Sequence, residues 1–312
     1  MTTPTRSVSD PQHGPRHDPQ PGPQRGPRPG PRPRLRPRLR SRQALRAVGG
    51  FALAAVALTA CSSGDSGGSG DSDSSATKSG SGSSSEKLSG TVTVFAAASL
   101  KESFTSLGKT FEKEHPGTKV SFNFGGSDSL AASITSGAPA DVFASASPKT
   151  MKTVTDAKAA KGTPATFVRN QLEIATLPGN PKKIATLKDL TGSGLKVALC
   201  AKEVPCGAAA QKALDGAGLK LTPVSYEQDV KGALTKVELK EVDASVVYKT
   251  DVNAAGGKVE GVEFPESKQA INDYPIALLK NAPNAEAATA FIDLVKSAQG
   301  QKVLGQAGFL KP

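Results

Sequence analysis

The sequence predicts an α/β fold with mainly parallel sheets for the region from about residue 88 to residue 312. Short apolar runs alternate there with stretches in which apolar residues recur at helical spacing. The two patterns follow each other along the chain instead of forming separate all-strand and all-helix blocks, which favours repeated strand–helix–strand units. The region is long enough for one large domain or two small ones.

In the first half of this region, each predicted strand is followed by a predicted helix. Four apolar residues recur at spacings of four, three and four between Leu100 and Phe111, which is the stripe expected of a half-buried helix. Ser147 and Pro148 suit the N-cap and the first residue of another helix. The expected strands are 91–97, 120–124 and 142–146, and the expected helices are 100–111, 129–134 and a solvent-facing, Lys- and Ala-rich helix at 151–161.

The alternation continues in the second half of the region. The expected strands are 195–200, 245–248 and 275–279, and the expected helices are 208–214, 230–239 and 284–297. Polar residues or glycines precede four of the predicted helices, at Ser99, 125–129, 205–207 and 229–232.

These junctions could hold a ligand or could simply begin helices. Ser99 and Glu102 fit a capping box, so Ser99 could serve only to cap its helix. Helix N-termini carry free N–H groups and the positive end of the helix dipole, so four of them at the carboxyl edges of two sheets could bind one anion. One such junction alone is weak support, because most α/β proteins have several.

The first 60 residues resemble a bacterial export signal. An Arg-rich stretch up to Arg46 precedes 14 uncharged residues, fewer than the roughly 20 that span a bilayer as a helix, and this pattern suits a signal peptide. Leu58-Thr59-Ala60-Cys61 resembles the lipobox of bacterial lipoproteins, in which the cysteine is lipidated and becomes the first residue. Ordinary secretion with a coincidental Cys61 is the alternative.

We therefore expect two parts in the N-terminal third of the chain, ahead of the folded region. Residues 1–60 would be a lipoprotein signal peptide with a long basic n-region, and residues 61–90 a flexible tether, since they are almost entirely Ser, Gly, Asp and Thr. The folded region would then be lipid-anchored through Cys61 at the outer face of the cytoplasmic membrane.

The net charge does not indicate nucleic-acid binding. The chain has 39 Lys and Arg against 28 Asp and Glu, a net charge of +11. Eleven Arg and two Asp of this total lie in residues 1–60, which leaves +2 for the rest of the chain, whose single arginine is Arg169. A DNA-binding domain would carry its positive charge on the folded region.

Few residues of the folded region could carry catalysis. His13 and His17 lie in the leader, and His115 stands alone in a polar turn where we expect it to be solvated, so neither a Ser-His-Asp triad nor an imidazole zinc site is available. Cys200 and Cys206 lack the Cys-x-x-Cys spacing of redox enzymes. Outside the membrane such a close pair predicts a small structural disulfide that stiffens the loop at 205–207, with free core thiols as the alternative. We expect no enzymatic activity.

Six motifs identify a family when they are taken together. They occur in order from about residue 90 to the C-terminus: Val94–Leu100 (VFAAASL), Gly137–Phe143 (GAPADVF), Val204–Gly207 (VPCG), Asp229–Leu234 (DVKGAL), Val246–Tyr248 (VVY) and Tyr274–Ala277 (YPIA). In combination they resemble the periplasmic molybdate-binding proteins of ABC importers. The resemblance implies a type II periplasmic-binding-protein fold, in which two α/β lobes enclose the ligand. It places lobe I at 88–168 plus 276–312 and lobe II at 169–275.

The resemblance also implies the ligand, its contacts and the partners. The ligand would be molybdate or tungstate, and no further cofactor is expected. The partners would be a membrane permease of an ABC importer with its ATPase, and the protein would be a monomer. The ligand-binding residues carried over are the hydroxyls and amides of Ser99 and Ser127, the hydroxyl of Tyr248 and the backbone N–H groups of Cys206 and Val230. Cys206 replaces a small residue, commonly Ala, in the family pattern.

A site of this composition suits a fully deprotonated oxyanion. Molybdate at neutral pH offers only hydrogen-bond acceptors, so its site should contain only donors, whereas phosphate retains a proton and would want an acceptor. Asp128, next to Ser127, is the discordant residue, and we expect its side chain to point away from the ligand.

Three other functions remain open at this point. A receptor for sulfate or another tetrahedral oxyanion would use the same donors. A thiol oxidoreductase would need a reactive thiolate at Cys200 or Cys206. An adhesion or signalling lipoprotein would need no ligand at all.

Overall fold

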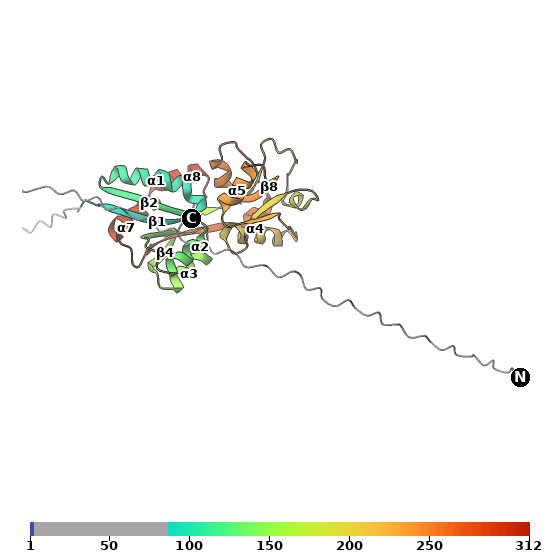
Figure 1. Ribbon diagram of the computed structural model, residues 1–312, viewed down its shortest axis with the longest axis horizontal. Coiled ribbons are helices and arrows are strands. Elements are labelled where there is room, and N and C mark those ends of the chain that lie inside the picture. The colour runs from blue at the N-terminus through green and yellow to red at the C-terminus, as the bar shows by residue number, and fades with distance from the viewer. Residues whose placement is uncertain (3–86) are drawn as a thin grey trace, which may run out of the picture. The chain divides into compact units, whose positions relative to one another are not determined.

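The computed structural model describes residues 1–2 and 87–312 of the chain (Figure 1). The described residues from Lys87 to Pro312 belong to one compact unit. The expected signal peptide, the lipidation site Cys61, and the tether up to residue 86 lie outside the described residues. Within the part that is described, no helix combines the length and apolar character needed to cross a bilayer.

One five-stranded sheet, with strand order β2-β1-β3-β10-β4, forms the framework of what we call lobe I. Helices α1, α7 and α8 pack on one face of this sheet around Phe104, Phe111 and Phe291, whereas α2 and α3 cover the other face (Figure 1). The elements of lobe I are β1 (Gly90–Ala97), the 3-10 helix η1 (Ala98–Leu100), α1 (Lys101–Glu114), β2 (Thr118–Gly125), α2 (Ser127–Thr135), β3 (Val142–Ala144), α3 (Pro148–Asp156), β4 (Ala160–Asn170), β10 (Asn272–Leu279), α7 (Ala285–Lys296) and α8 (Ala298–Ala307).

The second sheet, with strand order β7-β6-β8-β5-β9, forms the framework of lobe II. Its buried strands and the helices α4 and α5 share a separate apolar core. The elements of lobe II are β5 (Leu172–Thr176), η2 (Leu187–Thr191), β6 (Val197–Cys200), α4 (Pro205–Gly216), β7 (Ser225–Glu227), α5 (Val230–Glu238), β8 (Ala244–Tyr248), α6 (Lys249–Ala254), β9 (Glu260–Val262) and η3 (Pro265–Ala270).

Both sheets are mixed, so the expectation of mainly parallel sheets is only half right. In lobe I, β1 runs parallel to β2 and β3, but β10 is antiparallel to β3 and β4. In lobe II, β6 runs parallel to β7 and β8, but β5 is antiparallel to β8 and β9. The parallel pairs are the strand–helix–strand units that the sequence pattern predicts. The antiparallel pairs involve the strands on either side of the crossings between the lobes.

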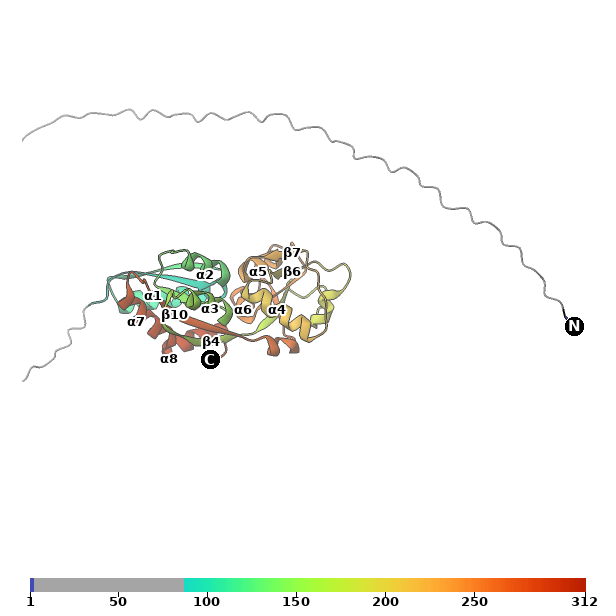
Figure 2. The same cartoon turned by 90° about the horizontal axis from the view of Figure 1, so that it is seen from below.

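The chain crosses between the lobes twice, at adjacent positions. It leaves lobe I after β4 and enters β5 through Gln171, and it returns through Ile271 into β10. Strands β4 and β10 lie side by side, with Asn272 opposite Asn170 at the crossing (Figure 2). Paired crossings of this kind form a hinge between two otherwise independent cores.

Most predicted elements of lobe I are confirmed, but the helix expected at 151–161 is wrong beyond Asp156. Helix α3 ends there, Lys158 adopts a left-handed φ of 55°, and strand β4 begins at Ala160. The Lys- and Ala-rich composition favours a helix locally, but pairing of β4 with β10 overrides this preference. In lobe II, α4 begins at Pro205, three residues before the predicted start.

Candidate functional site

Four helix beginnings from the two lobes surround one small cavity. Its volume of about 20 Å³ lies far below the roughly 300 Å³ at which pockets for drug-sized ligands begin, so it suits only a very small ligand. The five residues carried over as ligand contacts, Ser99, Ser127, Cys206, Val230 and Tyr248, all lie in its wall. The other lining residues are Ala97, Ala98, Gly125, Gly126, Ala146, Val204, Pro205 and Asp229.

Ser127 is the first residue of α2 and is almost fully buried. Its hydroxyl accepts a hydrogen bond from the backbone N–H of Ala146 at 3.0 Å. Because this bond uses a lone pair of the oxygen, the hydroxyl hydrogen stays free to donate to an acceptor in the cavity.

Tyr248 ends β8 and places its ring in the same cavity wall. Its hydroxyl accepts a hydrogen bond from Nδ2 of Asn272 at 2.6 Å, which again leaves the hydroxyl hydrogen available. Burial raises the pKa of the Tyr248 phenol well above its ordinary value, so at neutral pH this group is a donor and not an anion.

Ser99 does not cap a helix, which corrects the capping-box interpretation. The residue before α1 is Leu100, the residue before η1 is Ala97, and neither makes a side-chain capping bond. The hydroxyl of Ser99 instead lies 2.8 Å from the hydroxyl of Tyr274 on β10.

Tyr274 is a site residue that the sequence analysis used only as part of a motif. Its hydroxyl also accepts a hydrogen bond from Nδ2 of Asn170 at 3.3 Å. With that lone pair occupied, Tyr274 can donate to Ser99, and Ser99 can then donate into the cavity. Burial raises the pKa of Tyr274 as well, so the phenol keeps its proton. The one signal available from sequence is that a buried tyrosine needs a partner for its hydroxyl.

Backbone amides supply the remaining donors. Ser127 and Val230 are the first residues of α2 and α5, and Cys206 is the second residue of α4. Amides in the first turn of a helix have no carbonyl partner within the helix. Their N–H groups point out of the helix N-terminus, which is the positive end of the helix dipole. All three residues line the cavity, so their N–H groups can serve one ligand.

The start of α4 is held in place covalently and by close packing. Cys200 at the end of β6 forms a disulfide with Cys206, six residues later. Gly207 approaches the backbone so closely that an added Cβ would lie 1.9 Å from the carbonyl oxygen of Ala201. Together these contacts fix the position of the Cys206 amide in the cavity wall.

Among the described residues, the cavity wall contains a single carboxylate and no basic side chain. Asp229, the N-cap of α5, uses its carboxylate to accept the N–H of Gly232 at 2.9 Å, so its charge is engaged by the helix it caps. Asp128 is half-buried and does not line the cavity; its Oδ1 has no hydrogen-bond partner within the described part of the chain.

His115 is half-buried and not fully solvated as expected. Its ring packs against Phe111 with centroids 4.6 Å apart. Within residues 87–312, no group of three or more His, Cys, Asp or Glu side chains is arranged to hold a metal ion. The residues predicted to bind the ligand come together in the cavity wall.

With this geometry established, comparison with known proteins identifies the family. A family model for bacterial extracellular solute-binding proteins matches residues 92–310. The chain belongs to this family. Among curated relatives of this chain, the molybdate-binding protein ModA of Mycobacterium tuberculosis (strain H37Rv) is 43% identical over 222 residues, which cover 71% of this chain and 85% of that protein.

Solved structures of other binding proteins share the fold of this chain. The periplasmic molybdate-binding protein of Azotobacter vinelandii superposes with a TM-score of 0.63 at 22% identity, covering 71% of this chain and 99% of that one. The sulfate-binding protein SubI of M. tuberculosis superposes with a TM-score of 0.60 at 20% identity, covering 70% and 86% of the two chains. The type II periplasmic-binding-protein fold expected from the sequence is confirmed.

Proposed function

We propose that this protein captures molybdate, and tungstate with it, outside the cytoplasm and delivers it to the permease of an ABC importer. The observation that carries this proposal is the donor set of the cavity. Hydroxyls of Ser99, Ser127 and Tyr248 and first-turn amides of three helices converge there with no basic side chain in the wall. A ligand that offers only acceptors, such as a fully deprotonated tetrahedral oxyanion, matches this set.

Hydrogen bonds to a charged ligand can supply the required affinity without a Lys or Arg. Each such bond contributes about 1.5–3 kcal/mol, and micromolar to nanomolar binding requires about 8–12 kcal/mol. Several bonds of this kind therefore leave a margin for desolvation of the ligand and for closing the lobes. The chain would act by binding alone, without a catalytic step.

A sulfate receptor is the second candidate. Sulfate is also fully deprotonated at neutral pH, and the fold shared with SubI does not separate the two ligands. Selection of molybdate and tungstate would have to come from cavity size, because the metal–oxygen bonds are longer than the sulfur–oxygen bonds.

Isothermal titration calorimetry of the purified protein with molybdate, tungstate, sulfate and phosphate tests this proposal. We expect molybdate and tungstate to bind with micromolar or tighter Kd, and sulfate and phosphate to bind much more weakly. Sulfate binding as tight as molybdate binding would replace the molybdate assignment with the sulfate one.

We further propose that the protein is a monomeric lipoprotein held at the outer face of the membrane through Cys61. Residues 1–60 would be removed as a signal peptide, and residues 61–90 would tether the folded region to the membrane. Within the folded region, lobe I would comprise 88–168 plus 276–312 and lobe II would comprise 169–275. The motif at 58–61 supports this proposal. Metabolic labelling with palmitate should mark the wild type and not Cys61→Ala, which should instead appear in the medium.

A further inference from the structure

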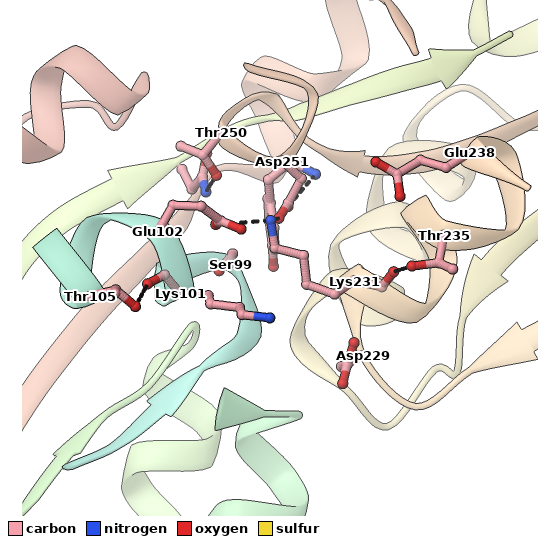
Figure 3. Close-up of polar contacts among 12 residues, drawn as sticks. Ser99, Lys101, Glu102, Thr105, Asp229, Lys231, Thr235, Glu238, Thr250 and Asp251 are labelled. Atoms are coloured by element: carbon pink, nitrogen blue, oxygen red, sulfur yellow. Dashed lines mark hydrogen bonds and ion pairs between the residues drawn. The ribbon is translucent and has the colours of Figure 1, made fainter. Parts of the chain in front are cut away.

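An ion cluster beside the cavity joins the two lobes. Nζ of Lys231, on α5 of lobe II, lies 3.0 Å from Oε2 of Glu102 on α1 of lobe I (Figure 3). The same ammonium lies 3.1 Å from Oδ1 of Asp251 on α6 of lobe II, a contact that is an ion pair and not an aligned hydrogen bond. Lys231 therefore bridges one carboxylate of its own lobe and one of the opposite lobe.

Burial differs among the three charges. The Asp251 side chain is fully buried and that of Lys231 is 22% exposed, whereas that of Glu102 is 49% exposed. A buried charge is strongly unfavourable without a partner. Asp251 thus needs Lys231 whether the lobes are open or closed, because both belong to lobe II. The contact with Glu102 can form only when lobe I closes on lobe II.

Each member of the cluster adjoins a residue of the cavity wall. Lys231 directly follows Val230, and Glu102 comes three residues after Ser99. Asp251 comes three residues after Tyr248 and accepts its backbone N–H through Oδ2 at 3.3 Å. The cluster therefore connects the three segments that carry the Ser99, Val230 and Tyr248 donors.

We propose that Lys231 and Glu102 are positioning residues of the oxyanion site, which hold the donors of lobe II against those of lobe I without touching the ligand. This inference rests on the proposed function and adds to it the residues that stabilise the ligand-bound arrangement. The pair forms only in the closed arrangement, so it favours that arrangement and slows ligand release. Effects on affinity should accordingly appear mainly in koff.

Glu102→Gln is the variant that tests the pair with least risk to folding. It removes one charge from a half-exposed side chain and leaves the Lys231–Asp251 ion pair intact. Glu114→Gln is the matched control, because Glu114 lies on the same helix and its carboxylate contacts Gln299 within lobe I. Both variants should keep the thermal stability of the ligand-free wild type.

Binding kinetics of molybdate, tungstate, sulfate and phosphate are measured for the two variants and the wild type. For whichever oxyanion the wild type binds, Glu102→Gln should raise Kd about fivefold, with most of the change in koff, as expected for a partly exposed ion pair. Glu114→Gln should match the wild type.

Salt and a conservative replacement provide a second readout. Raising NaCl from about 0.02 M to about 0.5 M should weaken binding more in the wild type than in Glu102→Gln, because screening acts on a pair that the variant lacks. Lys231→Arg keeps a cation that can reach both carboxylates and should retain the affinity. Lys231→Met should raise Kd at least as much as Glu102→Gln does, because it also removes the partner of Asp251.

The outcomes separate this inference from the proposed function. If the wild type binds sulfate tightly and Glu102→Gln binds it with a fivefold higher Kd, the ligand assignment changes to sulfate and the positioning role is supported. Unchanged Kd, koff and salt dependence in Glu102→Gln would overturn the positioning role and leave the molybdate assignment standing. A wild type that binds none of the four oxyanions would overturn both.

Discussion

Each hydroxyl in the cavity wall has a protein partner, and none of these contacts requires the hydroxyl's own hydrogen. Ala146 donates to Ser127, Asn272 donates to Tyr248, and Tyr274 lies within hydrogen-bond distance of Ser99. These contacts orient the hydroxyls before a ligand arrives, which reduces the entropy lost on binding. The donor character of the cavity thus depends on Asn272 and Tyr274, which do not line it, as well as on Ala146, which does.

Removing two of these hydroxyls should weaken oxyanion binding. For Ser99→Ala combined with Tyr248→Phe we expect a loss of about 2–6 kcal/mol, at about 1–3 kcal/mol for each contact. Calorimetric titration with molybdate measures the loss. The control is Ser133→Ala combined with Tyr226→Phe, which removes the same groups from exposed positions. Wild-type affinity in the first double variant would refute the site.

Asp251 should make stability depend on pH in a direction opposite to that of most carboxylates. Burial raises its pKa to about 6 in the folded protein, above the value of about 3.9 expected in the unfolded chain. The folded state therefore binds this proton more tightly, so the contribution to stability is fully present below about pH 4 and is lost as the pH rises through about 6. Lys231 and the backbone N–H of Tyr248 act in the opposite direction and lower this pKa, whereas the charge of Glu102 raises it further. The neighbouring tyrosine hydroxyls remain neutral.

Comparison with Asp251→Asn isolates this contribution. Thermal unfolding of both proteins is followed between about pH 4 and pH 8, a range that includes the folded pKa and approaches the unfolded one. The stability of the wild type relative to the variant should fall as the pH rises through 6. A difference that stays constant over this range would show that Asp251 does not titrate there.

At this scale the sequence predicts the cavity residues but not what orients them. Ser99 and Tyr248 lie in two of the family motifs and Ser127 lies in the polar junction at 125–129, and all three segments contribute to the cavity wall. The Ser99–Tyr274 contact joins residues 175 positions apart, and no local pattern encodes it. The capping box at Ser99 was misleading because the 3-10 turn η1 moves the start of α1 to Lys101.

Helix beginnings are the elements that make the site. Helices α2, α4 and α5 each start at the cavity, and the start of α4 is further constrained by the Cys200–Cys206 disulfide. The ligand contact proposed for Cys206 uses its backbone N–H, so the sulfur contributes only through the position of the loop. This arrangement makes a redox role unnecessary to explain the cysteines.

Replacing both cysteines should lower stability more than affinity. The disulfide closes a short loop, so Cys200→Ser combined with Cys206→Ser should reduce the free energy of unfolding by about 2 kcal/mol. Urea denaturation measures this change, and titration with molybdate should show a Kd within a few-fold of the wild-type value. Loss of all binding in a folded double variant would show that the bridge itself shapes the site.

Amphipathic helices, central strands and most of the hinge strand β10 were predictable, whereas the hinge strand β4 was not. In α1 the buried apolar residues recur at helical spacing, and in β1 and β8 they form continuous runs. Both patterns can be recognised in the sequence alone. Strand β4 begins with exposed and half-exposed residues and pairs with β10 from more than 100 positions away. Its conformation is set by that pairing, so its sequence carries no strand periodicity.

At the scale of the whole molecule, the two lobes meet where the cavity lies. Gly126, the residue before α2, approaches lobe II so closely that an added Cβ would lie 2.6 Å from the carbonyl oxygen of Gln228. Its backbone conformation, with φ of −61° and ψ of 131°, is one that alanine adopts readily. A methyl group at this position would also lie 2.8 Å from Oδ1 of Asp128 in lobe I, but that atom ends a side chain that can rotate, whereas the Gln228 carbonyl is backbone. Its main effect should therefore be on the contact between the lobes.

Gly126→Ala should impair closure and thereby weaken binding. We expect molybdate affinity to fall at least about tenfold, which corresponds to about 1.4 kcal/mol, with little change in the melting temperature of the ligand-free protein. Titration and small-angle X-ray scattering with and without molybdate would measure the two effects. A variant that becomes as compact as the wild type on adding molybdate would show that this contact does not limit closure.

The central claim is that a cavity of hydroxyls and amides, shared by two lobes and lined by no basic side chain, binds a tetrahedral metal oxyanion. The most direct test is a crystal structure of the protein grown with molybdate, with anomalous scattering used to locate molybdenum. We predict one molybdenum peak in the cavity, with the oxyanion within hydrogen-bond distance of Ser99, Ser127 and Tyr248. A peak at another place, or an empty cavity in a crystal saturated with molybdate, would contradict the claim.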